Sequence, residues 1–291
     1  MFFLFTFLGY LGILLFYLIG HRITRYTDKV KILGINIFPW ILLYPSLHMY
    51  TVMIGKDPLV LLGIALCGYS LTYAGIKKIY LFMGLLILLI IRPHIAIVFL
   101  ASLVVSFLIS SEWNVIQKSI LFIFSLVLGI ASIPYVIAFF RIEEFSLTAI
   151  QLMIEVNTGN VDDATTFVDM TSYPLILKMF TFLYRPLFID SPNVLLLEYS
   201  AENLFFLILS LNFLRLPFFQ WISKQSIFLK FALIYSLIGT MVLCNGFSVF
   251  GLFIRQKTMV FLFLLTLIFG FIHYRNSRYN HPISSSQNKS I

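Results

Sequence analysis

The chain has 291 residues, of which 60% are hydrophobic and 17% aromatic, with a formal net charge of +8 and a mean hydropathy of +0.98. Soluble globular domains contain only about 45–50% apolar residues, so this composition excludes a soluble domain and indicates an integral membrane protein. The basic residues are scattered between apolar stretches and form no continuous stripe, which argues against nucleic acid as a partner.

Apolar stretches long enough to cross about 30 Å of hydrocarbon recur along the chain. The first lacks a basic leader and a small-residue cleavage site, so we interpret it as a retained helix and not as a removable signal. Together they predict an all-α fold, a polytopic transmembrane bundle of about eight or nine helices that forms a single domain over residues 1–280. In chain order, we expect helices near Phe2–Gly20, Ile32–Tyr50, Leu59–Ile76, Ile79–Ile109, Ser119–Phe140, Asn193–Leu214, Ser226–Phe247 and Thr258–Ile272.

Basic residues concentrate in short segments between these stretches and in the tail, and short loops rich in Lys and Arg lie on the cytoplasmic side of membrane proteins. All these segments share one side only if the stretch Ile79–Ile109 enters the membrane and leaves it again on that side. This topology predicts a multi-pass protein of the cytoplasmic membrane, with residues 281–291 as a disordered cytoplasmic tail. The basic residues concerned are Arg22, Arg25, Lys29, Lys31, Lys77, Lys78, Lys118, Arg215, Lys224, Arg275, Arg278 and Lys289.

Arg92-Pro93-His94 interrupts the fourth stretch. Pro93 lacks a backbone donor and disfavours helical backbone at Arg92, so the pattern predicts a helical hairpin or a sharply kinked pair of helices. Charged groups inside a membrane are costly, and they face a bundle interior or a polar cavity in most cases. We therefore expect a polar pocket that opens to the outer face.

The longest hydrophilic stretch follows the fifth predicted helix and carries several acidic residues. The topology places it outside, so we expect residues 141–190 to form an extracytoplasmic loop followed by a segment that re-enters the membrane. Asp162, Asp163 and Asp169 lack the spacing of a calcium-binding loop, which favours a solvated acidic loop over a metal site.

Few basic residues face outward in this topology. Arg185 precedes Pro186 as Arg92 precedes Pro93, and Arg255 lies shortly before the last predicted helix. Arginine offers a planar fork of donors, which suits phosphate or pyrophosphate, so we expect the three arginines to converge on one anion. The alternative is that such side chains extend to lipid head groups. The predicted substrate-binding residues are Lys56, Arg92, His94, Arg185 and Arg255.

His48, Asp57 and Glu202 are the candidates for a catalytic acid or base. Asp57 precedes a proline, so a helix cap is its alternative role, and an interfacial side chain is the alternative for His48. Glu202 falls about 15 Å along its predicted helix, where a carboxylate needs a partner. We expect Arg92 or Arg185 as that partner, in either a structural ion pair or a catalytic arrangement.

The sequence contains no Walker motif, nucleotide-binding glycine fingerprint, zinc-ligand pair or Gly-x-Ser-x-Gly elbow. No cofactor is therefore expected.

Six short motifs together resemble polytopic proteins of bacterial surface-polysaccharide pathways, of the O-antigen-polymerase-like or type C glycosyltransferase-like kind. The resemblance implies that the chain uses sugars linked to polyprenyl phosphate or pyrophosphate at the outer face of the cytoplasmic membrane, with the phosphates held by Arg92, His94, Arg185 and Arg255. Type C glycosyltransferases place an essential acid in the loop after their first helix, whereas that loop is basic here, which suggests a divergent enzyme or a chain that lacks upstream helices. The motifs are Pro45-Ser-Leu-His48, Gly55-Lys-Asp57, Arg92-Pro-His94, Arg185-Pro186, Glu202-Asn203 and Gly251 with Arg255-Gln-Lys257.

The leading functional hypothesis is a membrane-embedded glycosyltransferase or polysaccharide polymerase. A transporter or flippase of lipid-linked oligosaccharides is the first alternative, because broken helices and buried charges suit transport as well. A noncatalytic membrane component of a polysaccharide-assembly complex is the second. The expected partners are a polyprenyl-linked saccharide, membrane lipids and other polysaccharide-assembly proteins.

Overall fold

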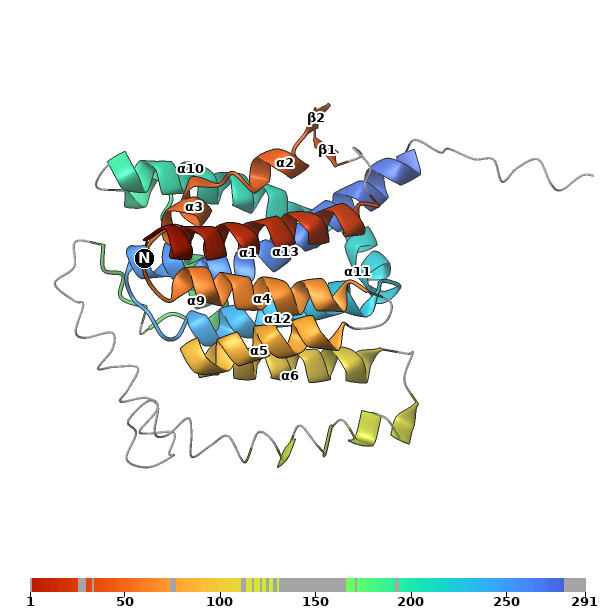
Figure 1. The fold of residues 1–291 in the computed structure, drawn as a ribbon. Coiled ribbons are helices and arrows are strands. Elements are labelled where there is room, and N and C mark those ends of the chain that lie inside the picture. Colours follow the sequence, from red (N-terminus) through yellow and green to blue (C-terminus); the bar gives the residue numbers. More distant parts are fainter. Residues whose placement is uncertain are drawn as a thin grey trace, which may run out of the picture.

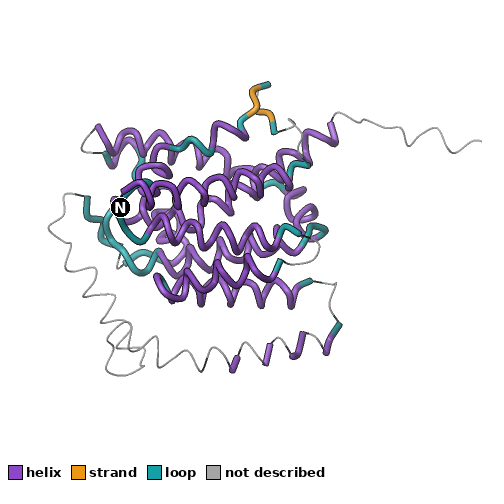
Figure 2. The backbone as a smooth tube through the Cα atoms, viewed as in Figure 1, coloured by secondary structure: helices purple, strands orange, loops and turns teal. Residues whose placement is uncertain are grey.

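A computed structural model describes residues 2–25, 30–32, 34–73, 77–110, 166–170, 172–191 and 194–279, together with parts of 114–130. The fold is 79% helical and 3% strand, which confirms the predicted all-α class. The long helices run along one another as a bundle (Figure 1), and helix makes up most of the described path (Figure 2).

The C-terminal helix is the centre of the bundle. In the most apolar window of α13 (Phe250–Tyr279), 89% of residues are buried, against 28% for α1 (Phe2–Ile23). Helix α13 contacts helices from both ends of the chain, including α1 and α12 (Ile227–Leu243). A helix buried on all sides is apolar all round, as this one is over most of its length. The body of the bundle consists of α1 (Phe2–Ile23), α4 (Asp57–Leu71), α5 (Lys78–Ile91), α6 (Pro93–Ile109), α12 (Ile227–Leu243) and α13 (Phe250–Tyr279).

Among the described residues, two helices are long and apolar enough to cross a membrane, Phe2–Ile23 and Phe250–Ser277. A third span results if the pair Leu196–Leu214 and Leu216–Ser223, which bends by 75°, is counted as one. Large apolar side chains are exposed on the outer surface of the bundle, among them Phe3 on α1 and Phe82 on α5. Exposed apolar surface of this extent fits lipid better than water. These features support membrane association, and the total of eight or nine spans stays a prediction.

The predicted span Ile32–Tyr50 is wrong, because the structure divides it into short elements. Strands β1 (Lys31–Ile32) and β2 (Ile35–Asn36) pair antiparallel around Gly34, whose φ of +83° favours glycine. Two short helices follow, α2 (Phe38–Ile41) and α3 (Pro45–Thr51), each with a proline in its first turn. Proline opens a helix readily but cannot sit in its interior, so two prolines six residues apart divide this apolar stretch.

The interrupted stretch forms the predicted helical hairpin. Helix α5 ends and α6 begins at Arg92, whose φ of −144° and ψ of 78° are not helical, and the chain reverses direction there (Figure 1). The N–H of Arg92 still donates to the carbonyl of Leu88 at 2.8 Å, and its own carbonyl accepts from Ile95 at 3.0 Å. The tip therefore caps both helices with its own backbone.

A second group of helices packs beside the bundle. Helix α9 (Leu175–Tyr184) contacts α10 (Val194–Ser210), α12 and α13, and its residue Phe182 is fully buried. The segment predicted to re-enter the membrane therefore includes a packed helix. An isolated bridge between Phe167 and Val249 ties the chain before α9 to the start of α13. The predicted span Ser119–Phe140 lies mostly outside the described residues, as do 141–165 and 281–291 entirely. The group consists of α9 (Leu175–Tyr184), η1 (Phe188–Asp190), α10 (Val194–Ser210), η2 (Leu211–Leu214) and α11 (Leu216–Ser223).

Helices α4 and α5 approach closely where Gly63 faces Gly84. A Cβ atom built on Gly84 would lie 2.6 Å from the carbonyl oxygen of Gly63 and 2.4 Å from Sγ of Cys67. Small residues at such a crossing let two backbones pack closely, which is the main source of helix association in lipid.

Replacing Gly84 with Ala should therefore destabilise the bundle by about 1–3 kcal/mol, the usual cost of overpacking. Thermal unfolding of the purified protein in detergent measures the effect. Gly246→Ala is the matched control, because the nearest atom to a Cβ there is the carbonyl oxygen of Leu243 at 3.8 Å. Equal unfolding temperatures for the two variants would contradict the close packing.

Candidate functional site

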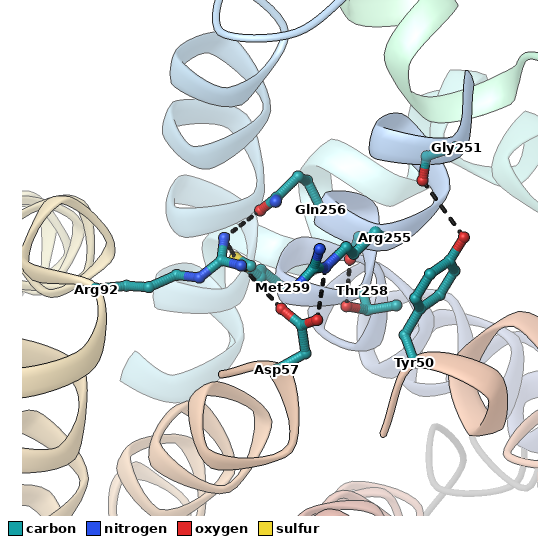
Figure 3. A network of polar contacts seen from close by, with 8 residues as sticks. All are labelled: Tyr50, Asp57, Arg92, Gly251, Arg255, Gln256, Thr258 and Met259. Atoms are coloured by element: carbon teal, nitrogen blue, oxygen red, sulfur yellow. Dashed lines mark hydrogen bonds and ion pairs between the residues drawn. The ribbon is translucent and has the colours of Figure 1, made fainter. Parts of the chain in front are cut away.

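A buried carboxylate lies between two guanidinium groups at one end of the bundle (Figure 3). Nη2 of Arg92 donates to Oδ1 of Asp57 at 2.8 Å, and Nε of Arg255 donates to Oδ2 at 2.6 Å. Arg92 also donates to Oε1 of Gln256. We refer to these four residues, Asp57, Arg92, Arg255 and Gln256, as the Asp57 cluster.

Three separate elements bring the cluster together. Asp57 is the first residue of α4 and is followed by Pro58, which starts a helix well. Arg92 is the tip of the α5–α6 hairpin, and Arg255 lies in the second turn of α13. The expected helix-cap role of Asp57 gives way to ion pairing, because both carboxylate oxygens accept from arginine.

The cluster is most buried on the Arg92 side and opens toward Arg255. The side chains of Arg92 and Asp57 are 11% and 10% exposed, whereas that of Arg255 is 37% exposed. Two positive charges face one negative charge, so the cluster carries an excess positive charge. Among the described residues, the Nη groups of Arg255 have no hydrogen-bond partner, which leaves guanidinium donors available to an external anion.

Neighbouring contacts hold the start of α13 in position for this pairing. The hydroxyl of Tyr50 donates to the carbonyl of Gly251 at 3.4 Å, and that of Thr258 donates to the carbonyl of Arg255 at 2.8 Å. The last helix is predicted to begin near Thr258, but α13 begins at Phe250. The charged side chains of its first turns are tolerated in a helix because they have polar partners inside the protein.

A second polar network lies between α10 and α13. Lys257 is only 5% exposed and donates to Oδ1 of Asn203, whose Nδ2 donates to the carbonyl of Pro186 at 2.9 Å. Glu202, which directly precedes Asn203 in α10, accepts a hydrogen bond from the backbone N–H of Ser46 at 3.0 Å. The structure thus differs from the expectation that Glu202 pairs with Arg92 or Arg185, because both arginines hold other carboxylates.

Arg185 does not join the Asp57 cluster. Its Nε and Nη2 donate to the two carboxylate oxygens of Asp190 at 2.9 and 2.6 Å, and its guanidinium lies 5.4 Å from the ring centroid of Phe250. The hydrogen bonds from Arg185 lower the pKa of Asp190, with a further contribution from the N–H of Leu187, and they raise the pKa of Arg185. The predicted convergence of three arginines is therefore found for two, and their shared anion is Asp57.

The remaining predicted site residues take separate positions. Nε2 of His48 donates to the carbonyl of Leu42 at 2.9 Å. Lys56 is exposed and directly precedes Asp57, while His94 is half-buried in the first turn of α6, two residues after Arg92. Lys56 and His94 thus lie next to or near residues of the Asp57 cluster in the sequence, whereas the hydrogen bond of His48 is to Leu42.

No group of three or more metal-ligating side chains occurs in the part of the chain that the structure describes. Asp162 and Asp163 lie outside that part.

The residues that the sequence did not single out are the amide side chains. Gln256 and Asn203 each accept a hydrogen bond from a buried cation, and both sit beside a predicted site residue in short motifs. In the sequence, each amide stands directly after a charged residue, Glu202 or Arg255, and this adjacency could have identified both amides.

Comparison with known protein families, with curated proteins and with solved structures finds no match for this chain.

Replacing Asp57 with Asn should destabilise the protein by about 3–5 kcal/mol, because it leaves a buried guanidinium without its carboxylate. Asp190→Asn is the matched control and should cost less, since Asp190 serves one arginine and Asp57 serves two. Chemical unfolding in detergent compares the two. An equal or smaller loss for Asp57→Asn would contradict the cluster.

The Arg185–Asp190 pair should also make stability depend on pH. Because the pKa of Asp190 is lowered in the folded protein, its stabilising effect is present at neutral pH and disappears as pH falls through the folded pKa. The difference in unfolding free energy between the wild type and Asp190→Asn should be constant near pH 7 and should shrink as pH falls from the ordinary aspartate pKa of about 3.9 through the lowered pKa of folded Asp190. A difference that is as large in acid, at the lowest pH at which both proteins still fold, as it is at pH 7 would exclude the ion pair as its source.

Proposed function

We propose that this chain is a membrane-embedded glycosyltransferase or polysaccharide polymerase that binds the phosphate of a polyprenyl-linked sugar at the Asp57 cluster. The observation that carries the proposal is the arrangement of Arg255, which uses Nε for Asp57 and keeps its partly exposed Nη groups without a partner among the described residues. The resemblance to O-antigen-polymerase-like and type C glycosyltransferase-like proteins supports the reaction class.

The position of the cluster is consistent with work at the outer face of the cytoplasmic membrane. The starts of α4 and α13 and the tip of the α5–α6 hairpin meet at one end of the bundle, and the basic end of α1 lies at the other (Figure 1). If the basic end is cytoplasmic, as the positive-inside rule predicts, the Asp57 cluster faces outward.

In the proposed complex the donor phosphate takes hydrogen bonds from the Nη groups of Arg255. Asp57 occupies the position of an anion in the free protein and keeps Arg255 oriented toward that site. Arg92 is held by both Asp57 and Gln256, so it stays in place and retains the carboxylate when Arg255 turns to the phosphate. Lys56 and His94 are the flanking residues proposed to contact the same substrate.

The proposed reaction is a substitution at the anomeric carbon of the donor. A bond forms between the acceptor hydroxyl oxygen and that carbon, while the bond from the carbon to the phosphate oxygen breaks and its electron pair remains on the phosphate. Guanidinium groups stabilise the charge that develops there. The hydroxyl proton passes to Oδ2 of Asp57, which Arg255 releases as it moves; Glu202 and His48 are the alternative bases.

A lipid-linked oligosaccharide flippase is the second candidate. One observation favours it. The three proposed bases, Asp57, Glu202 and His48, are all engaged in hydrogen bonds to other protein groups in the structure. A carrier needs the cationic site but no base, because it breaks no bond.

Elongation of a lipid-linked oligosaccharide by the protein reconstituted in vesicles tests the proposal. Arg255→Gln should lower the elongation rate by about 10²–10³-fold, the usual cost of removing one donor that stabilises transition-state charge. Arg215→Gln is the matched control and should leave the rate unchanged, because Arg215 is exposed and directly precedes α11, which lies at the other end of the bundle (Figure 1).

Full elongation by Arg255→Gln would contradict the phosphate-binding role. Movement of the lipid between leaflets without elongation would favour the flippase. Neither activity in the wild type would favour a noncatalytic component of a polysaccharide-assembly complex.

A further inference from the structure

A second cationic group lies at the opposite end of the bundle, around the ring of Tyr73. The guanidinium carbon of Arg22 lies 3.7 Å from the centroid of this ring, and Nζ of Lys77 lies 4.2 Å from it. Arg22 also donates hydrogen bonds to the hydroxyls of Tyr69 and Tyr73 and to Oγ1 of Thr72. The ends of α1 and α4 and the start of α5 are joined by this group.

The group contains two like charges and no carboxylate. Arg22 and Lys77 lie within about 8 Å of each other, because both are close to one ring centroid. Within the described chain, every hydrogen-bond partner of Arg22 is a neutral hydroxyl, and neither cation forms an ion pair. The Tyr73 ring contacts both cations but supplies no negative charge, so the group is suited to an anion.

The surroundings of the group fit an amphiphilic anion. Ile79 and Phe82, on the first turns of α5 next to Lys77, are 61% and 64% exposed. A phosphate held by Arg22 and Lys77 would therefore have an apolar helix face beside it for an acyl chain. Basic pockets between helices at the cytoplasmic side of membrane proteins bind lipid head groups in this way.

We propose that Arg22, Tyr73 and Lys77 form a binding site for the phosphate head group of an anionic phospholipid. The two cations bind the phosphate oxygens, and the Tyr73 ring holds them at a fixed separation. This site is independent of the proposed function, because it lies at the other end of the bundle from the Asp57 cluster and shares no residue with it.

The test compares two neighbouring lysines. Native mass spectrometry counts the phosphatidylglycerol molecules retained by the full-length protein from vesicles of phosphatidylglycerol and phosphatidylcholine. Lys77→Gln should weaken phosphatidylglycerol binding about fivefold, the effect of one basic residue near an anionic lipid surface. Lys78→Gln removes the same charge one residue away, outside the group, and should have little effect. Thermal unfolding checks that both variants fold.

Each outcome decides the proposal. A selective loss in Lys77→Gln that millimolar inorganic phosphate does not reproduce by competition supports a lipid head-group site. Displacement of the lipid by inorganic phosphate would show a site for free phosphate and overturn the lipid assignment. Equal effects of the two substitutions, or no preference for phosphatidylglycerol over phosphatidylcholine, would overturn the site itself.

Discussion

The carboxylate of Asp57 and the guanidinium of Arg92 are both about nine-tenths buried, and the rest of the site depends on their remaining together. Either charge alone in such surroundings costs several kcal/mol, whereas the pair with its further hydrogen bonds is tolerated. This constraint fastens the tip of the α5–α6 hairpin to the start of α4, and Arg255 extends the same pairing to α13. Because the three elements meet at one carboxylate, the excess positive charge and the partly exposed donors of Arg255 are fixed at one end of the bundle.

The two ends of the bundle handle positive charge in different ways. At one end, the carboxylate of Asp57 offsets one of two guanidinium charges, and the Nη groups of Arg255 have no partner among the described residues. At the other end, Arg22 and Lys77 both lie close to the ring of Tyr73, and in the described chain Arg22 donates hydrogen bonds only to neutral hydroxyls. Between the ends, the helices expose apolar side chains on the outside of the bundle and pack closely against one another inside it, as at Gly63 and Gly84. This distribution of polar ends and an apolar middle is what a membrane requires of a helical protein.

Much of the fold follows from local patterns in the sequence, and most of the site does not. The Arg92-Pro93-His94 interruption predicted the hairpin because proline chemistry acts within a few residues. The same rule applied to Pro39 and Pro45 would have divided the predicted span Ile32–Tyr50, where hydropathy alone suggested one helix. Pairing is harder to predict: Asp57 and Arg255 are 198 positions apart, and no periodicity links them. For that reason the sequence identified both as site residues, yet assigned Glu202 a partner that belongs to Asp57, and joined Arg185 to a cluster in which it takes no part.

A double-mutant cycle between Asp57 and Arg92 tests the central claim most directly, because it isolates the energy of their interaction from the other effects of each substitution. Unfolding free energies would be measured for the wild type, Asp57→Asn, Arg92→Gln and the double variant in one detergent. A direct buried ion pair predicts an interaction energy of at least about 1 kcal/mol, with the double variant more stable than the sum of the single losses implies. Additive losses, with an interaction energy near zero, would show that the two side chains do not meet and would contradict the account.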